Sequence, residues 1–147
     1  MVPLRRLLLA KLATLVLAAP AFADNIPEGR RIGLKGYDPV SYFEDGKPML
    51  GSREHWYGFD DVIYTFRSAN HRTKFVANPE RYAPQFAAYC AGGISKGYKV
   101  EPDPEAWLIA NGKLFVFQYK DRVPMFRETI GEVETKAREN WPKLRSN

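Results

Sequence analysis

The Asn111-Gly112 dipeptide constrains the fold of this chain more than any other feature of its sequence. It separates two apolar segments, 106–110 and 113–119, and it is the strongest short signal for a hairpin because both turn positions need positive φ angles. In the second segment aliphatic and aromatic residues alternate, so both faces of that strand are largely apolar. We therefore predict an antiparallel hairpin whose second strand is covered on both faces.

Start and stop signals divide the rest of the chain into short strands and helices. Ser68 and Asn78 are each placed to cap a helix, and proline directly after Asp38 and Asn78 favours a helix start because its φ angle is preset. The predicted fold class is α+β, a small antiparallel sheet covered by helices. The expected strands are 32–34, 55–57 and 62–66; the expected helices are 39–44, 69–77, 79–82, 85–91 (stopped by two glycines) and 122–141 (interrupted near Gly131 and ended by Pro142).

The first 23 residues have the pattern of a secretory signal. Three basic residues accompany an uncharged apolar run at 12–19, and Ala21-Phe22-Ala23 supplies the small residues that signal peptidase requires. The run is well short of the roughly 20 residues needed to span a bilayer. We predict cleavage after residue 23 by the general or the twin-arginine route, a periplasmic or secreted protein without a membrane span, and a single domain at 24–147.

Removal of this segment changes the charge balance. The 147 residues include 22 Lys and Arg and 17 Asp and Glu, a net charge of +5, and residues 1–23 hold three of the basic and none of the acidic residues. The remaining 124 residues carry a net charge of +2, with basic and acidic residues interleaved. This pattern is typical of an ordinary solvated surface, so nucleic acid and membrane surfaces are not expected partners.

Few residues are suited to catalysis or metal binding. The histidines are His55, in a predicted strand, and His71, in the first turn of the helix after Ser68; both positions are usually structural or superficial. A lone cysteine, Cys90, excludes an internal disulfide and a cysteine-only metal cage. There is no local metal-binding motif, nucleophile elbow or phosphate loop. Hydrolase and nucleotide-binding functions therefore have no support.

Cys90 has two interpretations. It lies among small residues, where a free cysteine is usually a buried and inert thiol. In an oxidising compartment, however, an unpaired thiol is open to reaction, and the two glycines after Cys90 would let a ligand or partner approach closely. Both interpretations stay open.

The order of several motifs resembles the YHS-domain family, and in particular the exported, stand-alone YHS-domain proteins of Gram-negative bacteria. The resemblance covers essentially all of 24–147. The motifs are Gly36-Tyr37-Asp38-Pro39-Val40, Tyr57 with Tyr64-x-Phe66-x-Ser68, Arg72-x-x-Phe75-x-x-Asn78-Pro79-x-x-Tyr82-x-Pro84, Tyr89-Cys90-Ala91, Asp103-Pro104-x-Ala106-Trp107 and Asn140-Trp141-Pro142.

The resemblance implies a compact sheet-and-helix module that binds a metal ion or a small cofactor, because related modules accompany heavy-metal transport ATPases and some oxygenases. Metal-associated members have thiols where this chain has Ser41, Arg67 and His71. A tight site made only of thiolates is therefore excluded. What remains is a mixed site of His71, Cys90 and tyrosine or carboxylate oxygen, or a site completed by the ligand itself.

The leading hypothesis is thus a periplasmic binding module with His71 and Cys90 as ligands of a transition metal such as copper or zinc. It predicts that the two side chains lie within about 4–5 Å of each other. The residues expected to line the surrounding pocket are Tyr37, Asp38, Ser41, Tyr64, Ser68 and Tyr89.

Two other functions stay open. A thiol-redox protein would place Cys90 partly exposed, near a positive charge or a helix N-terminus. A non-catalytic interaction module would leave Cys90 buried and unaccompanied. Enzymatic activity is not the favoured prediction, since no residue other than a redox-active Cys90 is a candidate for catalysis, and the sequence identifies no protein partner.

Overall fold

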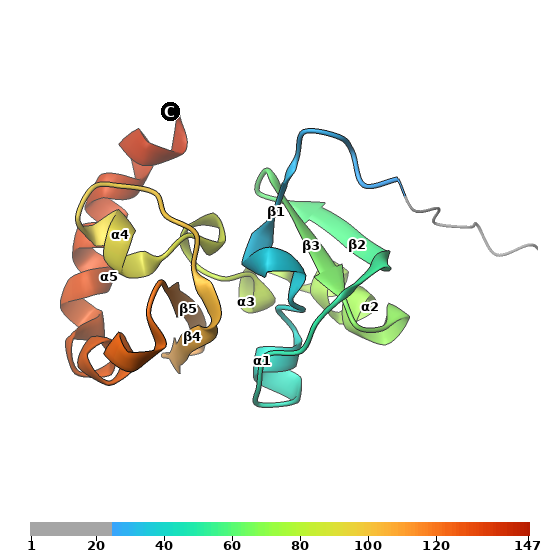
Figure 1. Cartoon of the computed structure of the whole chain (residues 1–147), viewed down its shortest axis with the longest axis horizontal. Helices are drawn as coiled ribbons and strands as arrows, with labels where there is room; N and C mark the ends of the chain where they lie inside the picture. Colours follow the sequence, from blue (N-terminus) through green and yellow to red (C-terminus); the bar gives the residue numbers. More distant parts are fainter. Residues whose placement is uncertain (1–24) are drawn as a thin grey trace, which may run out of the picture.

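The strands lie in two small sheets (Figure 1), in a computed structural model that describes residues 25–147. The predicted α+β class is confirmed, with the strands divided between two sheets instead of one; the predicted signal segment lies outside the described residues. The first sheet has the order β1-β3-β2, in which β1 runs parallel to β3, and the second is the antiparallel pair β4-β5. The strands are β1 (Arg31–Ile32), β2 (Ser52–Phe59), β3 (Val62–Phe66), β4 (Asp103–Ala110) and β5 (Lys113–Phe117).

The helices are distributed between the two sheets. In Figure 1, α1 and α2 lie beside the first sheet, and α4 and α5 lie beside the second. The α-helices are α1 (Ser41–Glu44), α2 (Ala69–Ala77), α3 (Pro79–Tyr82), α4 (Ala91–Ser95) and α5 (Val123–Arg145), and the short 3₁₀ segments are η1 (Gly33–Gly36), η2 (Phe86–Ala88) and η3 (Lys120–Arg122).

The hairpin is confirmed, and its second strand joins two hydrophobic cores. Leu114 and Val116 of β5 belong to a first cluster, which also contains Phe75 of α2 and Val62, Tyr64 and Phe66 of β3. Phe115 and Phe117, on the opposite face, belong to a second cluster with residues of α4 and α5. All four side chains are fully buried, so β5 is covered on both faces as predicted.

The helix predicted at 85–91 is wrong. Residues 86–88 instead form η2, with left-handed φ angles of 56°, 50° and 62°, and α4 begins where the predicted helix was to end. The glycines that were expected to stop the helix lie inside α4. A Cβ atom on Gly92 would lie 2.7 Å from Phe126, so glycine there allows α4 to pack closely against α5.

The last helix, α5, is longer than predicted, because it continues through both Gly131 and Pro142. A proline inside a helix removes a backbone hydrogen bond. Trp141 and Leu144, on either side of Pro142, both pack against the second cluster. This burial keeps the helix intact beyond the proline.

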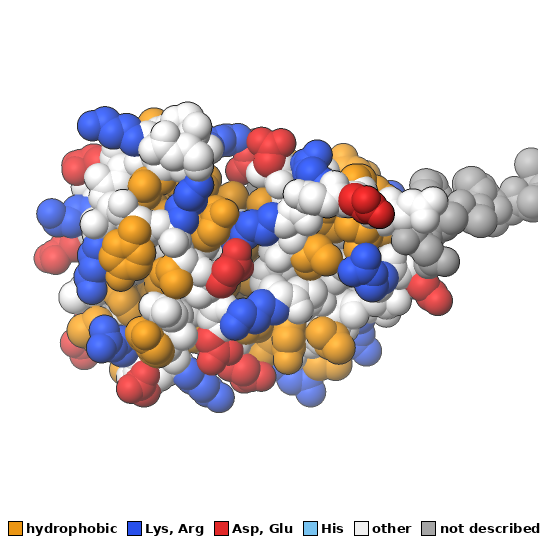
Figure 2. Space-filling view, turned by 45° about the horizontal axis from the view of Figure 1, so that its top comes forward, with side chains coloured by type: hydrophobic (Ala, Val, Ile, Leu, Met, Phe, Trp, Pro, Cys, Tyr) orange, Lys and Arg blue, Asp and Glu red, His pale blue; other side chains and the backbone are white. Residues whose placement is uncertain are grey.

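Charge on the surface follows the mixed pattern of the sequence. Basic and acidic side chains are interspersed over the face shown in Figure 2. Within residues 25–147, none of the helices combines the length and the apolar character required to cross a lipid bilayer.

Candidate functional site

Asp38 and His71 form a buried pair. The Oδ2 atom of Asp38 lies 2.6 Å from Nδ1 of His71, and the carboxylate is fully buried. The same carboxylate accepts hydrogen bonds from the backbone N–H groups of Val40, at 2.8 Å, and Arg67, at 2.9 Å. A buried charge is stable only when it is paired and hydrogen-bonded, and here three donors meet that requirement.

Two serines fix the backbone on both sides of this pair. Ser68 caps α2, as predicted, by accepting the N–H of His71 at 3.1 Å, which places the imidazole in the first turn of the helix. Ser41 donates to the carbonyl of Asp38 at 2.7 Å and accepts the N–H of Met49 at 3.1 Å. Four residues of the predicted site therefore belong to one hydrogen-bond network.

The network determines where the imidazole carries its proton. An ionised carboxylate only accepts hydrogen bonds, so Nδ1 of His71 must be the donor to Asp38. In the neutral ring the lone pair then lies on Nε2. Within residues 25–147, Nε2 of His71 has no hydrogen-bond partner. In this part of the chain the only buried side-chain nitrogen or oxygen without a partner is Oη of Tyr64. Nε2 is therefore not a buried atom, and solvent can reach it. This nitrogen can accept a proton or bind a metal ion.

Within residues 25–147, none of the three predicted tyrosines forms a hydrogen bond with Asp38 or His71. Tyr64 is fully buried in the first cluster, and burial raises the pKa of its hydroxyl, which therefore stays protonated. Tyr37 packs against the same cluster. Tyr89 instead lies against Trp141, at 6.3 Å between ring centroids, and beneath the guanidinium of Arg31.

Cys90 caps α4 in the second cluster. Its Sγ atom accepts the N–H of Gly93 at 3.4 Å, and the residue is 4% exposed. It lines a cavity of about 30 Å³ together with Lys96 and Arg122. The helix N-terminus and the positive charges that a redox role predicts are present, but the thiol is buried rather than partly exposed.

The structure does not bring His71 and Cys90 together. His71 lies on α2 and Cys90 caps α4, and these helices are at opposite ends of the molecule in Figure 1. A single ion cannot contact both side chains. In the described part of the chain, no group of three or more His, Cys, Asp or Glu residues could hold a metal ion.

Sequence reasoning missed the role of Arg31. Its guanidinium donates to the backbone carbonyls of Ala87 and Ala88, the latter at 3.1 Å, and pairs with Glu101. It also lies 3.7 Å from the centroid of the Tyr89 ring. Arg31 thereby ties β1 to the left-handed segment that leads to Cys90. No local pattern around residue 31 indicates this contact.

Comparisons of the chain with protein-family models, with curated proteins and with solved structures gave no match. The resemblance to the YHS family therefore rests on the motifs alone, and the site rests on its geometry. Among the residues singled out in the sequence, the Asp38–His71 pair is the arrangement that both holds an imidazole in place and leaves one of its nitrogens free.

Proposed function

We propose that the protein is an exported, periplasmic module of the YHS type that binds a metal ion, or a small cofactor containing one, through Nε2 of His71. The observation that carries this proposal is the 2.6 Å contact between Nδ1 of His71 and Asp38, which leaves the lone pair of Nε2 free to bind a metal ion. A metal-binding histidine characteristically donates its other N–H to a carboxylate in this way, because the contact fixes the ring and makes it more basic.

The donor set indicates how such a ligand would be held. A neutral imidazole suits copper and zinc, but His71 is a single ligand, and Cys90 lies too far away to be a second. The protonated hydroxyl of Tyr64 is a poor ligand as well. The other coordination positions would therefore be filled by water or by the small molecule that carries the metal. This is the ligand-completed site that the sequence left open.

Titration of the purified protein with Cu²⁺ and with Zn²⁺ tests the proposal. His71→Ala should weaken binding at least about tenfold, since it removes the one protein donor. Binding is measured by competition against a chromophoric chelator, and circular dichroism establishes that each variant is folded.

Two variants serve as controls. His55→Ala removes the other histidine, on β2, and Cys90→Ser removes the thiol; both should bind the metals as the unmodified protein does. Unchanged affinity in a folded His71→Ala protein would overturn the proposal. A loss caused by His55→Ala alone would place the bound metal at an unrelated surface histidine.

A thiol-redox function is the second candidate, and the position of Cys90 favours it. The thiol caps α4 and shares its cavity with two cationic side chains, Lys96 and Arg122. The step in question is oxidation of the thiolate by a peroxide to a sulfenic acid, with release of the reduced peroxide as water or an alcohol. The sulfur of a small thiol would then attack the sulfenic sulfur, forming a mixed disulfide as the S–O bond breaks and water leaves.

Trapping of the sulfenic acid tests this candidate. Folded protein is treated with hydrogen peroxide and dimedone, and the adduct is located by mass spectrometry, with Cys90→Ser as the control. A redox role predicts an adduct at Cys90 in the folded state. If an adduct forms only after unfolding, the burial of the thiol protects it and the redox function fails.

A further inference from the structure

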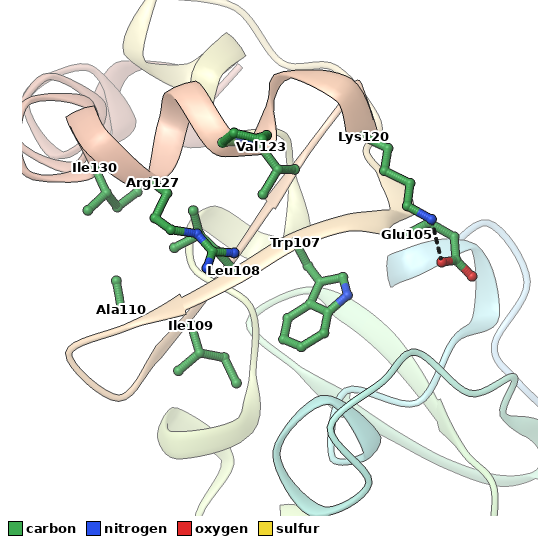
Figure 3. A pocket seen from close by; sticks show the side chains of 10 residues that line it. Glu105, Trp107, Leu108, Ile109, Ala110, Lys120, Val123, Arg127 and Ile130 are labelled. Carbon is green, nitrogen blue, oxygen red and sulfur yellow. Dashed lines mark ion pairs between the residues drawn. The ribbon is translucent and has the colours of Figure 1, made fainter.

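A groove of about 560 Å³ runs between β4 and the first half of α5 (Figure 3). Leu108 of β4 and Val123 of α5 are buried beside it, and Ile130 extends from α5 toward the strand. The residues lining the groove are largely apolar, and neither hypothesis about His71 or Cys90 involves them. It is a second candidate surface for binding.

One wall of the groove is an open sheet edge. Among residues 25–147, β4 pairs with β5 and with no other strand. In a hairpin with a two-residue turn, the residues that flank the turn form a hydrogen-bonded pair, here Ala110 and Lys113. Because the pattern alternates, the backbone groups of Trp107 and Ile109 point away from β5. They have no hydrogen-bond partner in the described part of the chain.

Four residues of this edge lack the features that usually prevent another strand from pairing with an open sheet edge. Natural proteins guard open edges with charges, prolines or bulges. The first half of β4 has Pro104 and an irregular register between Asp103 and Trp107. The stretch 107–110, Trp-Leu-Ile-Ala, has none of these devices and extends over about 13 Å at the usual rise of a strand.

The charge around the groove indicates what kind of segment would fit. Lys120 and Glu105 pair with each other at 3.5 Å at one end. Arg127 extends from α5 toward β4 and is exposed, and within residues 25–147 it has neither an ion pair nor a hydrogen bond. The uncompensated charge is positive. A second copy of the uncharged 107–110 stretch would leave it unpaired, whereas a segment with an acidic side chain would neutralise it.

We propose that β4 binds an extended, acidic segment of a partner protein as an added strand. The backbone of the segment pairs with the free N–H and C=O groups of Trp107 and Ile109. Its apolar side chains occupy the groove against α5, and its Asp or Glu side chain pairs with Arg127. The protein thereby gains an interaction surface distinct from the Asp38–His71 pair.

A peptide array tests the proposal with the full protein as the probe. The array carries seven-residue peptides in which Val, Ile or Leu alternates with Thr, Ser, Lys, Asp or Glu. We expect the retained peptides to contain Asp or Glu, and Arg127→Glu should weaken their binding at least about tenfold. Lys136→Glu, a matched change at an exposed position farther along α5, should leave binding within about twofold.

Backbone pairing has its own readout. On addition of the best retained peptide, amide exchange of Trp107 and Ile109 should slow at least about tenfold, while the amides of β2 are unaffected. An N-methylated version of the same peptide should bind at least about tenfold more weakly, since it lacks the donors of a strand.

Three results would overturn the proposal. The first is that the array retains no peptide, and the second is that Arg127→Glu binds the retained peptides as tightly as the unmodified protein does. The third is slow amide exchange of Trp107 and Ile109 in the absence of peptide because the protein self-associates, which would mean that a second copy of the chain occupies the edge. Sedimentation of the protein alone, with and without Ile109→Pro, distinguishes the last case.

Discussion

Replacement of Phe75 by alanine should lower the free energy of unfolding by about 3–5 kcal/mol. The ring is fully buried at the centre of the first cluster. Its centroid lies between 5.0 and 6.1 Å from those of four other rings, so truncation removes both buried area and aromatic contacts. The rings are Tyr57, Phe59, Tyr64 and Phe66. Urea unfolding followed by circular dichroism measures the loss.

The matched control is the next residue of the same helix. Val76 is 39% exposed, so Val76→Ala should change the stability by no more than about 0.5 kcal/mol. The two variants share a helix and a truncation to alanine, and they differ in the burial of the truncated side chain. Equal losses would mean that α2 does not present Phe75 to the cluster as described.

Features with a local cause could be predicted from the sequence. The Asn111-Gly112 turn needs only its own two φ angles, observed at 51° and 73°, and the flanking strands formed as expected. Ser68 and Asn78 cap helices through their own side chains, which accept backbone N–H groups three residues later. In each case the residues that create the structure lie within a few positions of each other.

Features with a distant cause could not be predicted. The left-handed segment 86–88 is held by Arg31, more than 50 residues earlier. In α4, Gly92 allows the close packing of Phe126, and Gly93 allows that of Val100 and Tyr98. Helix α5 passes through Pro142 because tertiary contacts lie on both sides of it. At these positions tertiary packing outweighs the local signals for the end of a helix.

The candidate site also has one feature with a local cause and one with a distant cause. The cap at Ser68 correctly put His71 in the first turn of α2, but its partner Asp38 lies 33 residues away and no spacing rule pairs them. The prediction that His71 and Cys90 lie close together is wrong, and the reason is topological. His71 lies on the helix that carries Phe75 into the first cluster, whereas Cys90 belongs to the second, and β5 lies between the clusters.

Replacement of Asp38 by alanine should lower the free energy of unfolding by about 3–5 kcal/mol. The change leaves the N–H groups of Val40 and Arg67, and Nδ1 of His71, without their acceptor in a buried site. Each unsatisfied donor costs about 1–3 kcal/mol. Asp45→Ala is the control, because Asp45 pairs with the Arg67 side chain at the surface, at 3.1 Å, where a pair contributes less than about 1 kcal/mol.

Asp38→Asn separates the stability of the pair from its chemistry. The amide keeps the shape of the carboxylate but has only one acceptor atom, so it cannot accept from Val40, Arg67 and His71 together, and the contact with His71 loses its negative charge. Loss of such a supporting carboxylate typically weakens metal binding by about 10–100-fold. Titration of this variant with Cu²⁺ at a fixed pH measures the effect. If the folded variant binds copper as tightly as the unmodified protein, the carboxylate of Asp38 does not support a metal-binding imidazole, and the proposed role of the Asp38–His71 pair in metal binding fails.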